Sequence, residues 1–193
     1  MNLEQDMAIG FDVFLFHDVF VLPDGYGRTR VALELAYGKQ NSDETLLREG
    51  ITPSLDDIRR YVSTTGVDGI IYTPPTQGRS IQFRDVLEKY LALPLWKIKA
   101  EKEIRPNKIL QAQKNIRDRS LRIKNALGSI MVDTPSNLMD LKHICILDDS
   151  FTTGATPNAI AIKLRNAGFT GKITIITICG SFSYDTAITD IEI

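Results

Sequence analysis

The sequence predicts an α/β fold in which a parallel sheet is flanked by helices. Residues 68–73 and 144–147 are short apolar runs rich in β-branched side chains, which are typical of parallel strands buried on both faces. Each run ends at a turn-rich loop, and apolar residues at helical spacing follow each loop. The 193 residues, 43% of them hydrophobic, suffice for the core of one domain. We therefore expect one domain, with an N-terminal part at residues 1–66 and a core at residues 67–193.

Two hydrophobic segments near the N-terminus predict a β-hairpin. Residues 11–22 and 28–37 are aromatic and aliphatic runs, and the Pro-Asp-Gly-Tyr-Gly sequence between them is typical of a turn. A short helix is expected near residues 43–48. A second helix is expected at residues 55–63, with Ser54 as its N-cap.

The first half of the core predicts a strand, a loop and a helix. The strand at residues 68–73 ends at two prolines, and the apolar residues of a helix at about 80–91 share one face. Two further short strands are expected at residues 95–98 and 129–132. The loop between the first strand and the helix consists of Thr76, Gln77, Gly78 and Arg79.

The charge of the chain is unevenly distributed. Although the net charge is −1, residues 97–124 contain ten Lys or Arg and three acidic residues, a balance of +7, and the rest of the chain carries −8. A basic segment in an otherwise acidic protein indicates a polyanionic partner, for which pyrophosphate and nucleic acid are the two obvious choices. A solvated, charged helix would show the same pattern.

The second half of the core contains the most informative segment, residues 142–156. An apolar strand ends there at Asp148 and Asp149, and a loop rich in Thr and Gly leads into a helix that begins near residue 155. The first N–H groups of a helix have no partner within it, and its dipole is positive at that end, so the junction favours a bound anion. Gly154 lets the backbone approach such an anion. Gly168 can end the helix, and residues 173–179 predict the next strand.

The residue types at this junction indicate a ribose 5-phosphate group. Thr152, Thr153 and Thr156 offer hydroxyl donors to a phosphate. Asp148 and Asp149 are acceptors only, so they suit the hydroxyls of the sugar, and any Mg²⁺ would come with the substrate. A helix cap followed by a surface loop would use the same residue types. The sequence has no GxxxxGK[ST] loop, nor a GxGxxG loop after a strand.

The segment Ile-Leu-Asp-Asp-Ser-Phe-Thr-Thr-Gly-Ala-Thr, residues 146–156, resembles the 5-phosphoribosyl-1-pyrophosphate (PRPP) motif of the type I phosphoribosyltransferases. The resemblance implies that Asp148 and Asp149 hold the ribose hydroxyls. It further implies a type I phosphoribosyltransferase-like parallel sheet flanked by helices, in which the N-terminal hairpin and helices form a hood over the acceptor. The residues implied to hold the 5-phosphate are Thr152, Thr153, Gly154, Ala155 and Thr156.

Other segments are similar to the ComF-like (competence protein F) branch of that family, and the resemblance covers about residues 68–180. The loop after the first core strand implies a pyrophosphate site, where Arg79 is the best candidate for a charged contact. Thr73, Pro74 and Pro75 stand where the branch has Pro-x-Pro followed by Arg, which removes an N–H donor. The basic segment implies a mobile loop, including Lys99, that screens the leaving pyrophosphate. The residues that resemble the pattern of the branch there are Gln113, Arg119, Arg122 and Asn125.

The resemblance implies a Mg²⁺-dependent phosphoribosyltransferase that joins a nitrogen acceptor to ribose C1 and releases pyrophosphate. Asp148, Asp149 and Arg79 are the catalytic candidates. Two alternatives remain open at this point: a regulatory module that binds PRPP or a nucleotide without turnover, and an accessory protein of DNA uptake or processing. The acceptor stays open, and so does the oligomeric state, for which a homodimer is one choice.

Cysteine, histidine and hydropathy patterns predict a cytoplasmic protein without a metal centre of its own. Cys145 and Cys179 each lie in an apolar strand without C-x-x-C spacing, so both are expected to be buried and unpaired. His17 and His143 are isolated and predict no metal site. No segment has the length of a membrane span, and the first residues lack the features of a secretory signal.

Overall fold

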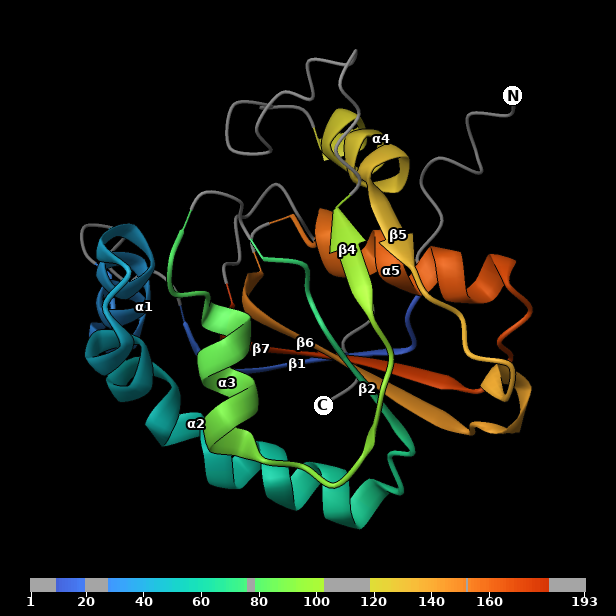
Figure 1. Cartoon of the computed structure of the whole chain (residues 1–193), viewed down its shortest axis with the longest axis horizontal. Coiled ribbons are helices and arrows are strands. Elements are labelled where there is room, and N and C mark those ends of the chain that lie inside the picture. The colour runs from blue at the N-terminus through green and yellow to red at the C-terminus, as the bar shows by residue number, and fades with distance from the viewer. Residues whose placement is uncertain (1–9, 20–27, 76–78, 103–118, 152, 181–193) are drawn as a thin grey trace.

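A parallel sheet lies at the centre of the molecule, with helices on both faces (Figure 1). The computed structural model describes residues 10–19, 28–75, 79–102, 119–151 and 153–180. Within them the sheet has five strands in the order β1-β7-β6-β2-β3, and every neighbouring pair is parallel. These strands are β1 (Val13–Val19), β2 (Gly69–Tyr72), β3 (Trp96–Lys97), β6 (His143–Phe151) and β7 (Lys172–Gly180).

The strands bury side chains on both faces because successive residues point to opposite sides. In β6, Cys145 and Leu147 pack against α1, α2 and α3, whereas Ile144 and Ile146 pack against α4 and α5. A two-stranded antiparallel sheet, β4 (Ala100–Lys102) with β5 (Ile130–Val132), packs into the same hydrophobic core as α4 and α5. The helices are α1 (Arg30–Asn41), α2 (Glu44–Thr65), α3 (Phe83–Leu91), α4 (Arg119–Ser129), α5 (Ala155–Asn166) and the short 3-10 helix η3 (Leu138–Asp140). The α/β class that the sequence predicts is confirmed.

The predicted N-terminal β-hairpin is wrong. β1 pairs in parallel with β7, and α1 covers most of the segment expected as the second hairpin strand. Thr29 begins this helix, because its hydroxyl oxygen accepts a hydrogen bond from the amide of Ala32 at 3.2 Å. Ala32 and Leu35 lie three residues apart and are both buried. The cap and the helical spacing therefore outweigh the β propensity of the aromatic and aliphatic residues.

The two helices predicted at residues 43–48 and 55–63 form one continuous helix, α2. Ser54 does not cap a helix, and its hydroxyl instead donates to the carbonyl of Ile51 at 2.8 Å within α2. Pro53 lies inside this helix, where a proline costs about 3 kcal/mol. The helix stays intact because its apolar face, including Leu47 and Ile51, is buried in the core.

The other predicted elements differ from the structure mainly at their ends. β2, β5, β7 and α5 confirm the strands predicted at residues 68–73, 129–132 and 173–179 and the helix predicted from residue 155. α3 begins three residues later than predicted, at Phe83. The strand predicted at residues 95–98 is reduced to β3, an exposed pair of residues at the sheet edge.

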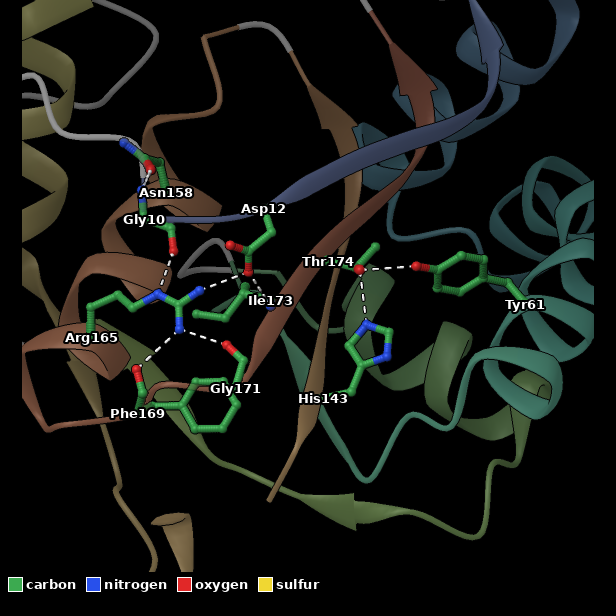
Figure 2. A network of polar contacts seen from close by, with 10 residues as sticks. All are labelled: Gly10, Asp12, Tyr61, His143, Asn158, Arg165, Phe169, Gly171, Ile173 and Thr174. Atoms are coloured by element: carbon green, nitrogen blue, oxygen red, sulfur yellow. Dashed lines mark hydrogen bonds and ion pairs between the residues drawn. The ribbon is translucent and has the colours of Figure 1, made fainter. Parts of the chain in front are cut away.

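The guanidinium of Arg165 holds the residues before β1 against α5 and β7 (Figure 2). It donates to the carbonyls of Gly10, Phe169 and Gly171, at 3.1, 3.0 and 2.6 Å, and to the carboxylate of Asp12 at 2.7 Å. The Asp12 carboxylate also accepts from the amide of Ile173 at 2.7 Å. One side chain thus connects the residues that precede β1 with the turn between α5 and β7.

A second polar network joins α2 to the sheet through His143, Thr174 and Tyr61 (Figure 2). His143 Nδ1 lies 3.2 Å from the carbonyl of Thr65, which can only accept, so we assign the proton to Nδ1. Nε2 then accepts from the Thr174 hydroxyl at 2.9 Å, and Tyr61 donates to Thr174 at 3.0 Å. The neutral imidazole thus fits this network, and burial lowers the pKa of His143.

We expect His143 to make the fold less stable in mild acid. Because the unfolded chain binds this proton at an ordinary pKa of 6.5 and the folded chain at a lower one, the contribution is complete above pH 6.5 and is lost as the pH falls. The measurement is the free energy of urea unfolding between pH 7.5 and 5, compared between the wild type and His143→Gln. The variant should lose part of the pH slope, and two parallel pH profiles would contradict a lowered pKa of His143.

Candidate functional site

A polar cavity of about 150 Å³ lies where β2 and β6 end, at the carboxyl edge of the sheet. We call it the strand-end cavity. It brings together four residues that the sequence singled out, namely Arg79, Asp148, Asp149 and Thr156. Its complete lining is Lys39, Thr73, Pro74, Pro75, Arg79, Gln82, Phe83, Arg84, Lys102, Asp148, Asp149 and Thr156.

The two carboxylates lie within β6, which continues to Phe151, whereas the sequence predicted that this strand ends at Asp148 and Asp149. Pairing with β7 continues through Asp148, opposite Thr177, and through Phe151, opposite Gly180. The apolar run stops at residue 147, but the backbone of β7 is long enough to extend the ladder by four residues. The acids are therefore held on a rigid strand, which fixes their position better than a loop would.

Different neighbours bind the two carboxylates. Asp148 accepts hydrogen bonds from the Thr73 hydroxyl at 2.7 Å and from the amide of Asp149 at 2.9 Å. Asp149 forms an ion pair with Lys39 and accepts from the Ser150 hydroxyl at 2.9 Å. Asp148 is thus tied to the end of β2, and Asp149 is tied to α1.

The two acids differ in protonation near neutral pH. Burial, together with the adjacent Asp149 charge, raises the pKa of Asp148 to about 7. Burial acts in the same direction on Asp149, but the charge and the hydrogen bond of Lys39 outweigh it and lower its pKa below the ordinary value. The pair therefore carries a single negative charge through much of the range below pH 7, and one carboxyl group can then donate a hydrogen bond.

We expect Asp148→Asn to remove a pH dependence of stability that has the opposite sign to that of His143. The folded chain binds this proton more tightly, with a pKa of about 7 against an ordinary 3.8. The stabilising contribution is complete below pH 3.8 and is lost as the pH rises to about 7. The free energy of unfolding of the variant, relative to the wild type, should therefore rise between pH 5 and 8. A constant difference across that range would show that Asp148 titrates normally.

Lys39 is the main site residue that the sequence did not reveal. It lies in the last turn of α1, and its side chain is 25% exposed. The sequence placed a hairpin strand in this region, so no residue of it was assigned to the site. The helical spacing and the Thr29 cap would have identified α1, but its contact with Asp149, 110 residues away, needs the tertiary fold.

Basic side chains outnumber acids in the strand-end cavity. Arg79, Arg84, Lys39 and Lys102 line it together with the two carboxylates, one of which has a raised pKa. The sequence predicted Arg79 as a site residue and placed Lys102, which ends β4, in the basic segment. It did not reveal Lys39 or Arg84, which lies in the first turn of α3. A cavity with this balance favours a ligand with several negative charges, since charged hydrogen bonds are stronger than neutral ones.

The start of α5 reaches the same cavity through Thr156. Gly154 precedes the helix with a φ of 65° and has no side chain that could cap it. The amides of Ala155 and Thr156 lack partners within the helix, whereas Pro157 has no N–H. Thr153 is half-buried beside this turn. Thr152 lies outside the described residues.

The residues predicted for the pyrophosphate and mobile loops divide into three groups. Thr76, Gln77, Gly78 and Gln113 lie outside the described residues. Lys99 is exposed, and its ammonium forms an ion pair with Glu101 at 2.8 Å, which raises the pKa of the lysine. Arg119, Arg122 and Asn125 lie in α4, and the described part of the segment predicted as a loop contains β4 and α4.

A second cavity, of about 320 Å³, adjoins the first and is called here the α1 cavity. Both cavities are lined by Lys39, Arg79 and Asp149, so they meet at the Lys39–Asp149 ion pair. The remaining lining of the α1 cavity comes from α1, β6 and β7, and consists of Ala32, Leu35, Ala36, Gln40, Ser150 and Cys179.

No protein-family model matches the chain, and no curated protein matches it either.

Among the described helices, none combines the length and the apolar character that a bilayer crossing requires. The described residues contain no group of three or more His, Cys, Asp or Glu that could hold a metal ion. Cys145 and Cys179 are buried and unpaired, as predicted.

Proposed function

We propose that the protein binds PRPP, or another ribose 5-phosphate group, and transfers the phosphoribosyl unit to a nitrogen acceptor with release of pyrophosphate. The observation that carries this proposal is the composition of the strand-end cavity. Paired carboxylates, the first turn of a helix and several cations all line one space of about 150 Å³. A phosphorylated sugar with a pyrophosphate group needs these three kinds of contact together.

The 5-phosphate would bind at the start of α5. There the amides of Ala155 and Thr156 and the hydroxyls of Thr153 and Thr156 offer donors, and the helix dipole favours negative charge. Gly154 provides the left-handed backbone, with a φ of 65°, that leads into this turn. This end of the site binds an anion without using a Lys or Arg.

The ribose would bind at Asp148 and Asp149. Two carboxyl groups on adjacent residues can accept hydrogen bonds from two neighbouring hydroxyls of the sugar. They also fit a Mg²⁺ that arrives with the substrate, because Mg²⁺ in phosphate-binding sites is commonly held by one or two carboxylates together with phosphate oxygens. The ion would neutralise charge on the pyrophosphate.

The pyrophosphate would lie toward Arg79, Arg84 and Lys102, in the cavity that Pro74 and Pro75 also line. In the reaction the acceptor nitrogen forms a bond to ribose C1 with its lone pair, and the C1–O bond breaks with its electron pair passing to pyrophosphate. An acceptor nitrogen that carries an N–H then loses this proton to solvent, whereas a pyridine-type nitrogen becomes a cation. Positive charge develops on the ribose, so the adjacent carboxylates stabilise it while the cations stabilise the leaving group.

The test is a thermal-shift titration with PRPP, ribose 5-phosphate and nucleoside monophosphates, each with and without Mg²⁺, followed by a pyrophosphate-release assay with a panel of bases. The double variant Asp149→Asn, Thr153→Ala should lose the ribose-phosphate shift while it remains folded. Its control is Asp140→Asn, Thr64→Ala, which makes the same chemical changes at exposed positions. An unchanged shift in the first variant would contradict the assigned pocket.

A regulatory module that binds PRPP without turnover is the second candidate. Pro74 and Pro75 lie at the edge of the cavity and offer no backbone N–H where a pyrophosphate would accept one. Binding that depends on the α5 end of the site would survive this loss, whereas stabilisation of the leaving group would suffer. A thermal shift with PRPP but no pyrophosphate release with any base would favour this candidate.

A further inference from the structure

The α1 cavity is suited to a small second ligand. Its volume of about 320 Å³ lies at the lower end of the range for ligand pockets. One wall is apolar and consists of Ala32, Leu35 and Ala36 of α1. The short alanine side chains leave room beside the sheet, and a flat ring would bury its faces there. The cavity opens onto the strand-end cavity at Asp149, so a ligand in it would lie next to the ribose.

The charges of the α1 cavity select among such ligands. Lys39 and Arg79 line it together with one carboxylate, Asp149, which leaves an excess of positive charge. Cys179 does not offset this excess, because burial raises the pKa of its thiol to about 12 and the group stays neutral. Among the residues that the structure describes, no carboxylate pairs with the Arg79 guanidinium. A ligand that brings a negative charge would satisfy both cations.

Lys39 can serve two partners in turn. In the absence of ligand it neutralises Asp149, and the ion pair lies on the boundary of the two cavities. A sugar hydroxyl that donates to Asp149 competes with Lys39 for the same carboxylate oxygens. The lysine side chain is flexible and 25% exposed, so its ammonium can turn toward an anion in the α1 cavity.

We propose that the α1 cavity is a subsite for a small nitrogen heterocycle bearing a carboxylate, and that Lys39 determines this specificity together with Arg79. This inference rests on the proposed function, since it names the chemical class of the acceptor. An amide in place of the carboxylate keeps the shape of the ligand but removes the charge. The protein should therefore distinguish the acid from the amide, and Lys39 should account for most of the difference.

The test uses nicotinate and nicotinamide, which differ only in carboxylate against carboxamide. Each is titrated calorimetrically into the full chain with Mg²⁺ and ribose 5-phosphate, which has no leaving group and so prevents turnover. We expect the wild type to bind nicotinate about tenfold more tightly or better. Lys39→Met should reduce this preference to less than about threefold, mainly by weakening nicotinate binding. The control is Lys172→Met, which changes an exposed lysine at the amino end of β7 and should retain the wild-type preference.

The outcomes separate this inference from the proposed function. If ribose 5-phosphate binds but nicotinate and nicotinamide bind equally or not at all, the carboxylate subsite is overturned and the phosphoribosyl site stands. If nicotinate is preferred through Lys39 although neither PRPP nor ribose 5-phosphate binds, the charged subsite is supported and the phosphoribosyl function is contradicted. A preference that survives in Lys39→Met would also overturn the role of Lys39.

Discussion

Replacing Gly154 by alanine should abolish ribose 5-phosphate binding and lower the free energy of unfolding by about 2–4 kcal/mol. The backbone at this residue has a φ of 65°, which residues other than glycine adopt at a cost of about 1–2 kcal/mol. A Cβ here would also lie 2.3 Å from two ring carbons of Phe151, whose side chain is buried. The turn must therefore shift, and with it the amides at the start of α5. Urea unfolding and a thermal-shift titration with ribose 5-phosphate measure the two effects.

Gly66→Ala is the matched control for this prediction. Gly66 has nearly the same φ, 67°, but nothing lies within 4 Å of the position of its Cβ. This variant should show only the backbone cost of about 1–2 kcal/mol and should bind ribose 5-phosphate as the wild type does. Equal destabilisation by the two substitutions would mean that the Phe151 ring moves aside freely. Normal binding by Gly154→Ala would count against a phosphate at the start of α5.

Replacing Arg165 by methionine should lower the free energy of unfolding by about 2–4 kcal/mol, chiefly by releasing β1. The variant keeps most of the aliphatic stem but leaves the carbonyls of Gly10, Phe169 and Gly171 and the carboxylate of Asp12 without the guanidinium (Figure 2). Because Asp12 leads into an edge strand, the loss should be local. Urea unfolding gives the total effect, and amide hydrogen exchange should accelerate in β1 more than in β6.

Lys163→Met, two residues earlier in the same helix, controls for the change of charge. It should change the free energy of unfolding by less than about 0.5 kcal/mol. If Arg165→Met accelerates hydrogen exchange equally in β1 and β6, the substitution lowers global stability. The proposed local role of Arg165 in holding β1 is then wrong. Because β1 precedes α1, a released β1 should also loosen Lys39, and ribose 5-phosphate affinity in Arg165→Met would report that coupling.

The site depends on the meeting of three segments that are far apart in the sequence. α1 contributes Lys39, the end of β2 contributes Thr73, and β6 contributes the two carboxylates. Parallel pairing brings the carboxyl ends of β2 and β6 to one edge of the sheet, where ligands bind in this class of fold. The opposed pKa values of Asp148 and Asp149 follow from this arrangement, since only one of the acids has a lysine beside it.

The segment from β6 to β7 could be predicted from the sequence because its signals are local. The apolar run at residues 144–147, the glycine before α5 and the next apolar run each act within a few residues. The predicted end of β6 at Asp148 is too early, because a hydrophobicity pattern ends where the side chains become polar. The backbone ladder ends only where the neighbouring strand does, at Phe151 opposite Gly180.

The N-terminal part was predicted poorly because its outcome depends on distant partners. Short aromatic and aliphatic runs fit a strand or a helix almost equally well, and a turn between them favours a hairpin when no other strand is considered. The structure offers β7 as an alternative partner, with Val13 opposite Thr174. α2 likewise runs through Pro53 because the core stabilises both of its halves together.

The sequence alone determined the α/β class, the paired acids and the glycine-led start of α5, since hydrophobic periodicity and capping operate over one or two turns of chain. Only the tertiary structure decided that β1 lies beside β7, that Lys39 neutralises Asp149, and that two cavities share this ion pair. Those contacts join residues more than one hundred positions apart. Their formation depends on burial and on strand register, which are properties of the whole sheet and not of any short segment.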